Sequence, residues 1–80
     1  MVHDLKIKYE FAQLHFIGKK NWELRKNDRD FKVGDTIRFT VLEWESSSNW
    51  KYERTITNVF EDASLGLQEG YVILSIEKEL

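Results

Sequence analysis

The chain has 80 residues, 41% hydrophobic and 14% aromatic, with a formal net charge of −2. This length allows one compact core, and the hydrophobic content is too high for a disordered chain. The absence of cysteine excludes disulfides and thiolate metal sites, and the two histidines lack a metal-ligand spacing.

We therefore expect one domain over residues 1–80 that needs no metal or other cofactor. The start of the chain lacks the apolar core of a signal peptide, and no apolar run reaches membrane-spanning length. These features predict a cytoplasmic protein without a membrane partner. The isoelectric point near 5.6 argues against strong nonspecific binding of nucleic acid.

Apolar periodicity predicts the first elements. Leu5 and Ile7 indicate a short first strand. Apolar residues at helical spacing then predict an amphipathic helix, with His15 on its surface: Tyr9, Phe11, Ala12, Leu14 and Phe16. Gly18 is expected to end this helix, because glycine adopts the left-handed conformation that closes a helix.

Residues 21–25 alternate between apolar and polar side chains. Trp22 and Leu24 lie on one predicted face, and Glu23 and Arg25 point together from the other. The sequence therefore predicts a strand with one apolar and one polar face.

An anchored turn over residues 31–35 leads into the next predicted strand. Its alternation places three residues in the core, namely Ile37, Phe39 and Val41, and three outside, namely Thr36, Arg38 and Thr40. Leu42 and Trp44 are apolar at the opposite parity, which predicts a β-bulge near residues 41 and 42.

A polar hairpin loop over residues 45–51 is followed by a strand over residues 52–60, with one face formed by Tyr52, Ile56 and Phe60. Residues 62–70 are expected to form a cap and one helical turn, with Leu65 and Leu67 pointing inward. The last strand, residues 71–76, is apolar on both faces and should be central, with Leu74 in the core.

Half of the positive charge lies in one short segment. Residues 19–32 carry +3 and the rest of the chain carries −5, and the cations of the segment are Lys19, Lys20, Arg25, Lys26, Arg29 and Lys32. Such a local excess is typical of a small surface that binds phosphate or another anion.

The same segment carries a family resemblance. Gly18-Lys19-Lys20-x-x-Glu23-x-Arg25 resembles the Gly-x-Lys-x-x-Glu-x-Arg signature of ASCH domains in the PUA-like superfamily. Residues 3–7, 25–35 and 66–76 resemble, in the same order, a small bacterial and phage family grouped with these domains. The resemblance implies an α+β fold, a small twisted and partly closed β-barrel with one flanking α-helix. It also implies a cleft formed by residues 18–35.

In ASCH and PUA-like domains this cleft is associated with RNA or nucleotide-like ligands. The signature positions are Lys20, Glu23 and Arg25, which offer a mobile charge, an acceptor and a planar fork for phosphate or a base edge. Further candidates for ligand contact are Lys19, Lys26, Arg29, Tyr71 and His3.

Structural alternatives accompany these assignments. Glu23 and Arg25 can simply form an ion pair with each other. Arg29 can simply neutralise its acidic neighbours. His3 can simply anchor the first strand, and Tyr71 can be a core ring with a wet edge. For Trp44, Trp50 and Tyr52, which flank the serine loop, cross-strand packing is the default interpretation over base stacking.

We expect a binding module for RNA or a nucleotide-like ligand, and assign no catalytic residue. Some small ASCH proteins hydrolyse acylated nucleosides and others are linked to RNA cleavage, so a small hydrolase is the first alternative. The amidohydrolases of that group have a threonine nucleophile where this chain has Glu23, which cannot serve that role. The second alternative is a phage or bacterial protein-interaction module anchored by exposed tryptophans.

Overall fold

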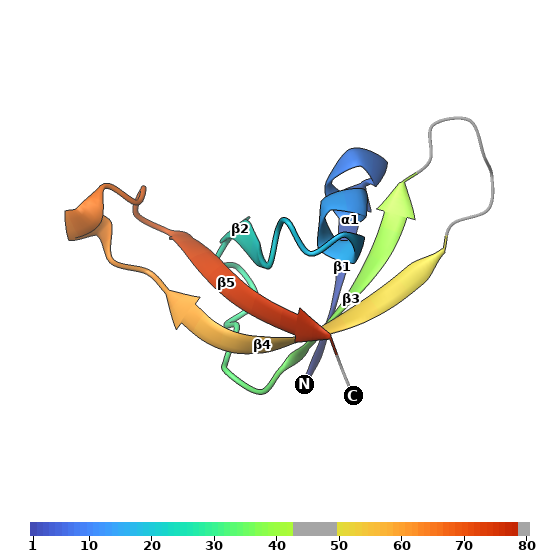
Figure 1. Cartoon of the computed structure of the whole chain (residues 1–80). Helices are drawn as coiled ribbons and strands as arrows, with labels where there is room; N and C mark the ends of the chain where they lie inside the picture. Colours follow the sequence, from blue (N-terminus) through green and yellow to red (C-terminus); the bar gives the residue numbers. More distant parts are fainter. Residues whose placement is uncertain (43–49, 79–80) are drawn as a thin grey trace.

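The computed structural model describes residues 1–42 and 50–78 (Figure 1). In chain order the elements are β1 Val2–Lys8, α1 Tyr9–Phe16, β2 Trp22–Lys26, β3 Thr36–Leu42, β4 Lys51–Phe60, the short 3₁₀ helix η1 Ala63–Leu65, and β5 Tyr71–Lys78. The strands form one sheet in the order β1-β3-β4-β5-β2, in which only β1 and β3, among the described pairs, run parallel.

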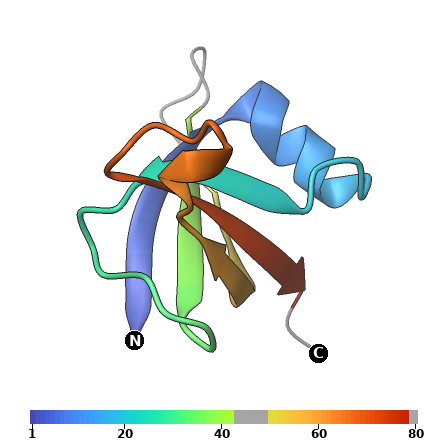
Figure 2. The same ribbon diagram turned by 90° about the vertical axis from the view of Figure 1, so that its left-hand side faces the viewer.

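The sheet is strongly curled, with α1 packed beside its open side (Figures 1 and 2). The two edge strands, β1 and β2, approach each other there, and Arg25 Nη2 of β2 donates a hydrogen bond to the carbonyl of Lys6 in β1 at 3.0 Å. One side-chain contact therefore bridges the two edges. The predicted α+β class, a twisted and partly closed barrel with one flanking helix, is confirmed.

The core lies on the concave face of the sheet and beneath α1. Its buried apolar residues are Leu5, Ile7, Ala12, Phe31, Ile37, Phe39, Val41, Ile56, Val72, Leu74 and Ile76. The alternation predicted for β3 is confirmed, because its three expected core residues are fully buried. β5 has a neighbour on both sides, as predicted for a strand that is apolar on both faces.

Gly18 ends α1 as predicted. It has a φ of 76°, and the amides of Lys19 and Lys20 both donate to the carbonyl of Leu14, at 3.0 and 3.1 Å. This tight closure reverses the chain between α1 and β2. Lys20 consequently lies next to the start of β2, beside the helix that precedes it.

Three local predictions need correction. The pairing of β1 with β3 is continuous through Leu42, and the register shift lies instead in β4, between Ile56 and Asn58. Because that shift changes the strand's parity, Val59 rather than Phe60 packs against the core. Leu65 is 74% exposed and not inward, although the predicted cap is present, since Asp62 Oδ1 accepts from the Ser64 amide at 2.9 Å. Trp44 and most of the predicted serine loop lie outside the described residues.

Candidate functional site

β2 has the two faces that the sequence predicts, and its polar face is the interior one. Glu23 is 3% exposed, whereas Trp22 is 46% exposed and Leu24 is likewise at the surface. Burial of a carboxylate requires partners for both of its oxygens, since an unpaired buried charge is strongly destabilising. The fold supplies these partners from α1, from the turn after it and from β2 itself.

Three side chains converge on the Glu23 carboxylate. His15 Nε2 lies 2.9 Å from Oε1, and the ammonium group of Lys20 binds the same oxygen. Arg25 contacts Oε2 through Nε at 3.1 Å and through Nη2 at 3.0 Å. We call these four residues the Glu23 cluster. Because both oxygens are occupied, the carboxylate orients Lys20 and Arg25 and has little capacity left to accept from a ligand.

The charges of the Glu23 cluster compensate one another. Burial alone raises the pKa of Glu23, but the His15 and Lys20 contacts and the charges of Lys20 and Arg25 outweigh it and hold this pKa below its ordinary value of 4.5. Glu23 is therefore ionised at neutral pH. Its two flanking cations are fixed in position by an anion that is withdrawn from solvent.

His15 is the residue that the sequence reasoning misplaced. It is 3% exposed and lies between Glu23 and Tyr52 of β4, whose hydroxyl is 2.6 Å from Nδ1. Burial, followed by the charge of Glu23, raises the pKa of Tyr52 well above its ordinary value, so the hydroxyl stays protonated. The two ring nitrogens of His15 therefore face two different polar groups, Nε2 the Glu23 carboxylate and Nδ1 the Tyr52 hydroxyl. Through this contact Tyr52 connects the Glu23 cluster to β4.

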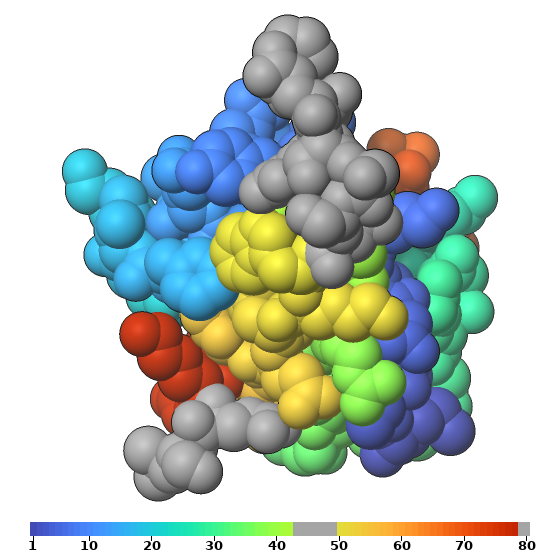
Figure 3. Space-filling model, turned by 90° about the vertical axis from the view of Figure 1, so that its right-hand side faces the viewer, coloured from blue at the N-terminus to red at the C-terminus, as the bar shows by residue number. Residues whose placement is uncertain are grey.

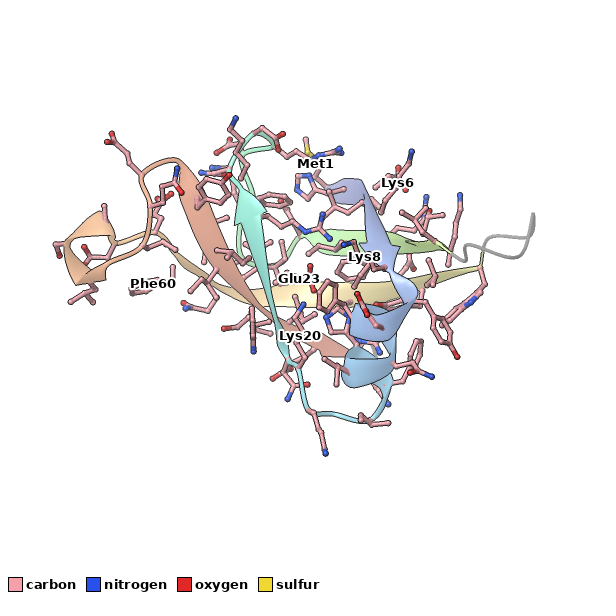
Figure 4. All side chains as sticks on the ribbon, turned by 90° about the horizontal axis from the view of Figure 1, so that it is seen from above. Met1, Lys6, Lys8, Lys20, Glu23 and Phe60 are labelled. Atoms are coloured by element: carbon pink, nitrogen blue, oxygen red, sulfur yellow. The ribbon has the colours of Figure 1, made fainter. Side chains whose placement is uncertain are left out.

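A pocket of about 440 Å³ lies over this cluster, at the gap between the edge strands. We call it the seam pocket, and its lining residues are Lys6, Ile7, Lys8, Phe11, Lys20, Trp22, Glu23, Leu24 and Arg25. Figure 4 shows Glu23 and Lys20 between β2 and α1, with Lys8 at the connection from β1 to α1 and Lys6 on the side of β1 that faces away from β2. Four basic residues therefore line the pocket, and two of them, Lys20 and Arg25, contact its buried carboxylate.

Aromatic rings complete the seam pocket. The Lys20 ammonium lies 4.8 Å from the ring centroid of Trp22 and 5.2 Å from that of Phe11. Both rings remain about half exposed, so they offer faces to a ligand. Sequence reasoning did not assign Lys6, Lys8, Phe11 or Trp22 to the site. These residues meet in the seam pocket because β1 approaches β2, and the local sequence pattern contains no signal of that approach.

The other predicted candidates lie apart from the Glu23 cluster. Lys19, Lys26 and Arg29 are exposed, and Arg29 pairs with Asp28 at 3.9 Å. Tyr71 is half-buried and pairs with Lys26 at the end of β2 remote from Lys20.

His3 contacts Asp35 rather than the cluster. It is buried, and its Nε2 lies 2.8 Å from Asp35 Oδ2. It also packs on Phe31, with 4.7 Å between ring centroids. These contacts match the alternative in which His3 anchors the first strand.

Neither a metal-binding group nor a membrane-spanning helix occurs within the described part of the chain. No three histidine, aspartate or glutamate side chains there are placed to hold an ion. No helix in residues 1–42 and 50–78 is long and apolar enough to cross a bilayer.

The fold and the Glu23 cluster describe a small, partly closed barrel with a charged pocket at its seam. Residues 2–76 match a family described as a domain of unknown function, DUF3850, and the chain belongs to this family. It is 37% identical over 75 residues to an uncharacterized 12.9 kDa protein in the GpA 3′ region of Escherichia phage P2. That match covers 91% of this chain and 65% of the phage protein, so the chain spans about two thirds of the length of this relative.

The fold also resembles that of a solved structure. A crystal structure of hypothetical protein PH0355 superposes with a TM-score of 0.64 and 20% identity, and the match covers 96% of this chain and 98% of that one. At this identity the likeness shows a shared fold alone.

Proposed function

We propose that this protein is an ASCH-type, PUA-like module that binds RNA or a nucleotide-like ligand in the seam pocket. The main support is that four basic residues and two half-exposed aromatic rings line one pocket of about 440 Å³. Cations attract the phosphate and aromatic faces stack on a base, which is the combination that single-stranded nucleic acid requires.

Pre-organisation favours the same function. Glu23 fixes Arg25, and the Arg25 fork also holds the carbonyl of Lys6 across the seam. A ligand phosphate thus meets charges whose positions are already set, which lowers the entropic cost of binding. Lys6 and Lys8, by contrast, are exposed and free to adjust to the ligand.

The geometry supports binding better than hydrolysis. Lys20 is an ammonium group already bound to a carboxylate, and it lacks the lone pair that a general base needs. Both oxygens of Glu23 are occupied, so this residue has no free position from which to attack or to transfer a proton.

A titration followed by ¹H–¹⁵N NMR tests this proposal. Adenosine 5′-monophosphate and a short single-stranded RNA are added, and the shifts are expected to converge on Lys20, Trp22 and Arg25. Lys8→Gln should weaken binding by roughly 5-fold, because it removes one exposed cation of the pocket without disturbing the Glu23 cluster. Lys51→Gln removes a cation of the same kind from β4, outside the pocket, and should leave affinity unchanged.

Salt dependence adds a second criterion. With about three phosphate contacts, log affinity for single-stranded RNA should fall with log salt at a slope of roughly −2. The proposal fails if no nucleotide shifts the pocket residues, or if Lys51→Gln weakens binding as much as Lys8→Gln. Turnover of an acylated nucleoside or RNA that Lys20→Ala abolishes would establish the hydrolase instead.

A further inference from the structure

A second concavity lies at the end of the sheet, between the C-terminal end of α1 and the adjoining parts of β4 and β5. It has a volume of about 720 Å³, and we call it the end groove. Its polar lining residues are His15, Lys20, Asn21, Arg54, Thr57, Ser75, Glu77 and Lys78. Figure 3 shows these three regions on one face, with the end of α1 in light blue, β4 in yellow to orange and the end of β5 in red.

Arg54 is the unusual residue of the end groove. It is 7% exposed, and its guanidinium lies 5.2 Å from the ring centroid of Phe16 and 4.8 Å from that of Tyr52. Nη1 donates to the carbonyl of Glu53 at 2.8 Å, whereas Nη2 is buried and has no acceptor among the described residues. Buried charged donors are nearly always paired in native structures, so this nitrogen indicates a missing acceptor.

The lining defines the chemistry of that acceptor. Thr57 and Ser75 provide hydroxyls, and Lys20 and Lys78 provide positive charge. Glu77 is the carboxylate among the lining residues, and it forms no described ion pair with Arg54. A guanidinium beside hydroxyls and ammonium groups matches an oxyanion with several acceptor oxygens, as in phosphate.

Lys20 lines the end groove and the seam pocket alike. It therefore forms the boundary between two concave surfaces, one with aromatic faces and one with a guanidinium nitrogen, Arg54 Nη2, that lacks an acceptor in the described part of the chain. A ligand that stacks on Trp22 and continues past Lys20 reaches the groove that contains Arg54.

We propose that the end groove is a phosphate site, and that the ligand is an oligonucleotide which places a base in the seam pocket and a following backbone phosphate at Arg54. This inference rests on the function proposed above and extends it, because it distinguishes a strand from a free nucleotide. A mononucleotide fills the seam pocket alone, whereas a strand of several nucleotides fills both surfaces.

The experiment compares adenosine 5′-monophosphate with single-stranded tetra-adenylate in the full chain and two variants. Wild-type protein should bind the tetranucleotide at least 10-fold more tightly. Arg54→Gln should remove most of this gain, on the order of 10-fold, and leave the mononucleotide affinity unchanged. Arg38→Gln removes the same charge from the exposed face of β3, where Arg38 pairs with Asp4 and Glu53, and should retain the gain.

The outcomes separate this inference from the proposed function. If the mononucleotide binds but the tetranucleotide gains nothing, or if the gain persists in Arg54→Gln, the phosphate site is refuted and the seam pocket stands. If neither ligand binds, both proposals fail. Should Arg54→Gln not fold, the side-chain NMR signals of Arg54 in the wild type decide, since the tetranucleotide must shift them and the mononucleotide must not.

Discussion

Replacement of Glu23 by glutamine is the sharpest test of how the site is built. The variant keeps the shape of the side chain and removes the charge to which His15, Lys20 and Arg25 are fixed. One of its two oxygens also becomes an NH₂ group, which must face a donor. The loss of one partner from a buried ion pair costs about 3–5 kcal/mol.

The structure places this variant near the lower end of that range. The Lys20 and Arg25 side chains are 13% and 26% exposed, so water can replace part of what they lose, whereas His15 is almost fully buried. We expect Glu23→Gln to lower the free energy of unfolding by about 3 kcal/mol. For a domain of this size the Tm should then fall by roughly 12 °C or more.

The pH dependence gives the prediction a second, independent signature. The pKa of Glu23 is lower in the folded protein than in the unfolded chain. Ionised Glu23 therefore stabilises the fold at any pH above its pKa in the unfolded chain, and this stabilisation is lost as the pH falls through its pKa in the folded protein. The stability difference between wild type and variant should therefore be full at neutral pH and shrink below about pH 4.5.

Urea unfolding followed by circular dichroism, repeated from pH 3 to pH 7, measures both effects. Glu69→Gln removes an exposed carboxylate at the surface and serves as the matched control. A loss below about 1 kcal/mol for Glu23→Gln, equal to that of an ordinary surface change, would refute the reasoning. If the stability difference between wild type and Glu23→Gln does not change with pH, the inference that Glu23 is ionised in the folded protein is refuted.

Two further predictions concern the elements that hold the cluster in place. Tyr52→Phe removes the hydroxyl bound to His15 Nδ1 and leaves a buried ring nitrogen without its partner, so urea unfolding should show a loss of about 1–2 kcal/mol. No loss would mean that water or another group serves His15 equally well. Gly18→Ala places a side chain at a φ of 76° where no atom lies within 4 Å, so it should cost about 1–2 kcal/mol through backbone strain alone. An unchanged Tm for Gly18→Ala would contradict the helix-closing role of Gly18.

The sequence predicts the strands, the helix and the convergence of Lys20, Glu23 and Arg25 because local rules determine each of them. The period of two in β2 places Glu23 and Arg25 on one face, and the turn at Gly18 places Lys20 beside that face. These two local rules suffice to bring the three side chains together.

The direction of that face is a tertiary property. A polar strand face ordinarily points to solvent, and here it points inward because α1 presents His15 to it. The spacing of Ala12 and His15, one helical turn apart, is a weak signal that both lie on the buried side of α1. A histidine on that side needs a polar partner, and Glu23 is the partner that the fold provides.

The same contacts that close the barrel also shape the pocket. Arg25 joins the edges of β1 and β2 and lines the seam pocket, and Glu23 orients Arg25 from the interior. A change at either residue therefore alters stability and ligand contact together, so a loss of binding there cannot be assigned to one cause. Lys8 lies in the same pocket and outside the cluster, and a change there leaves the seam closed. The ligand chemistry of this fold is therefore best tested at Lys8, and its architecture at Glu23.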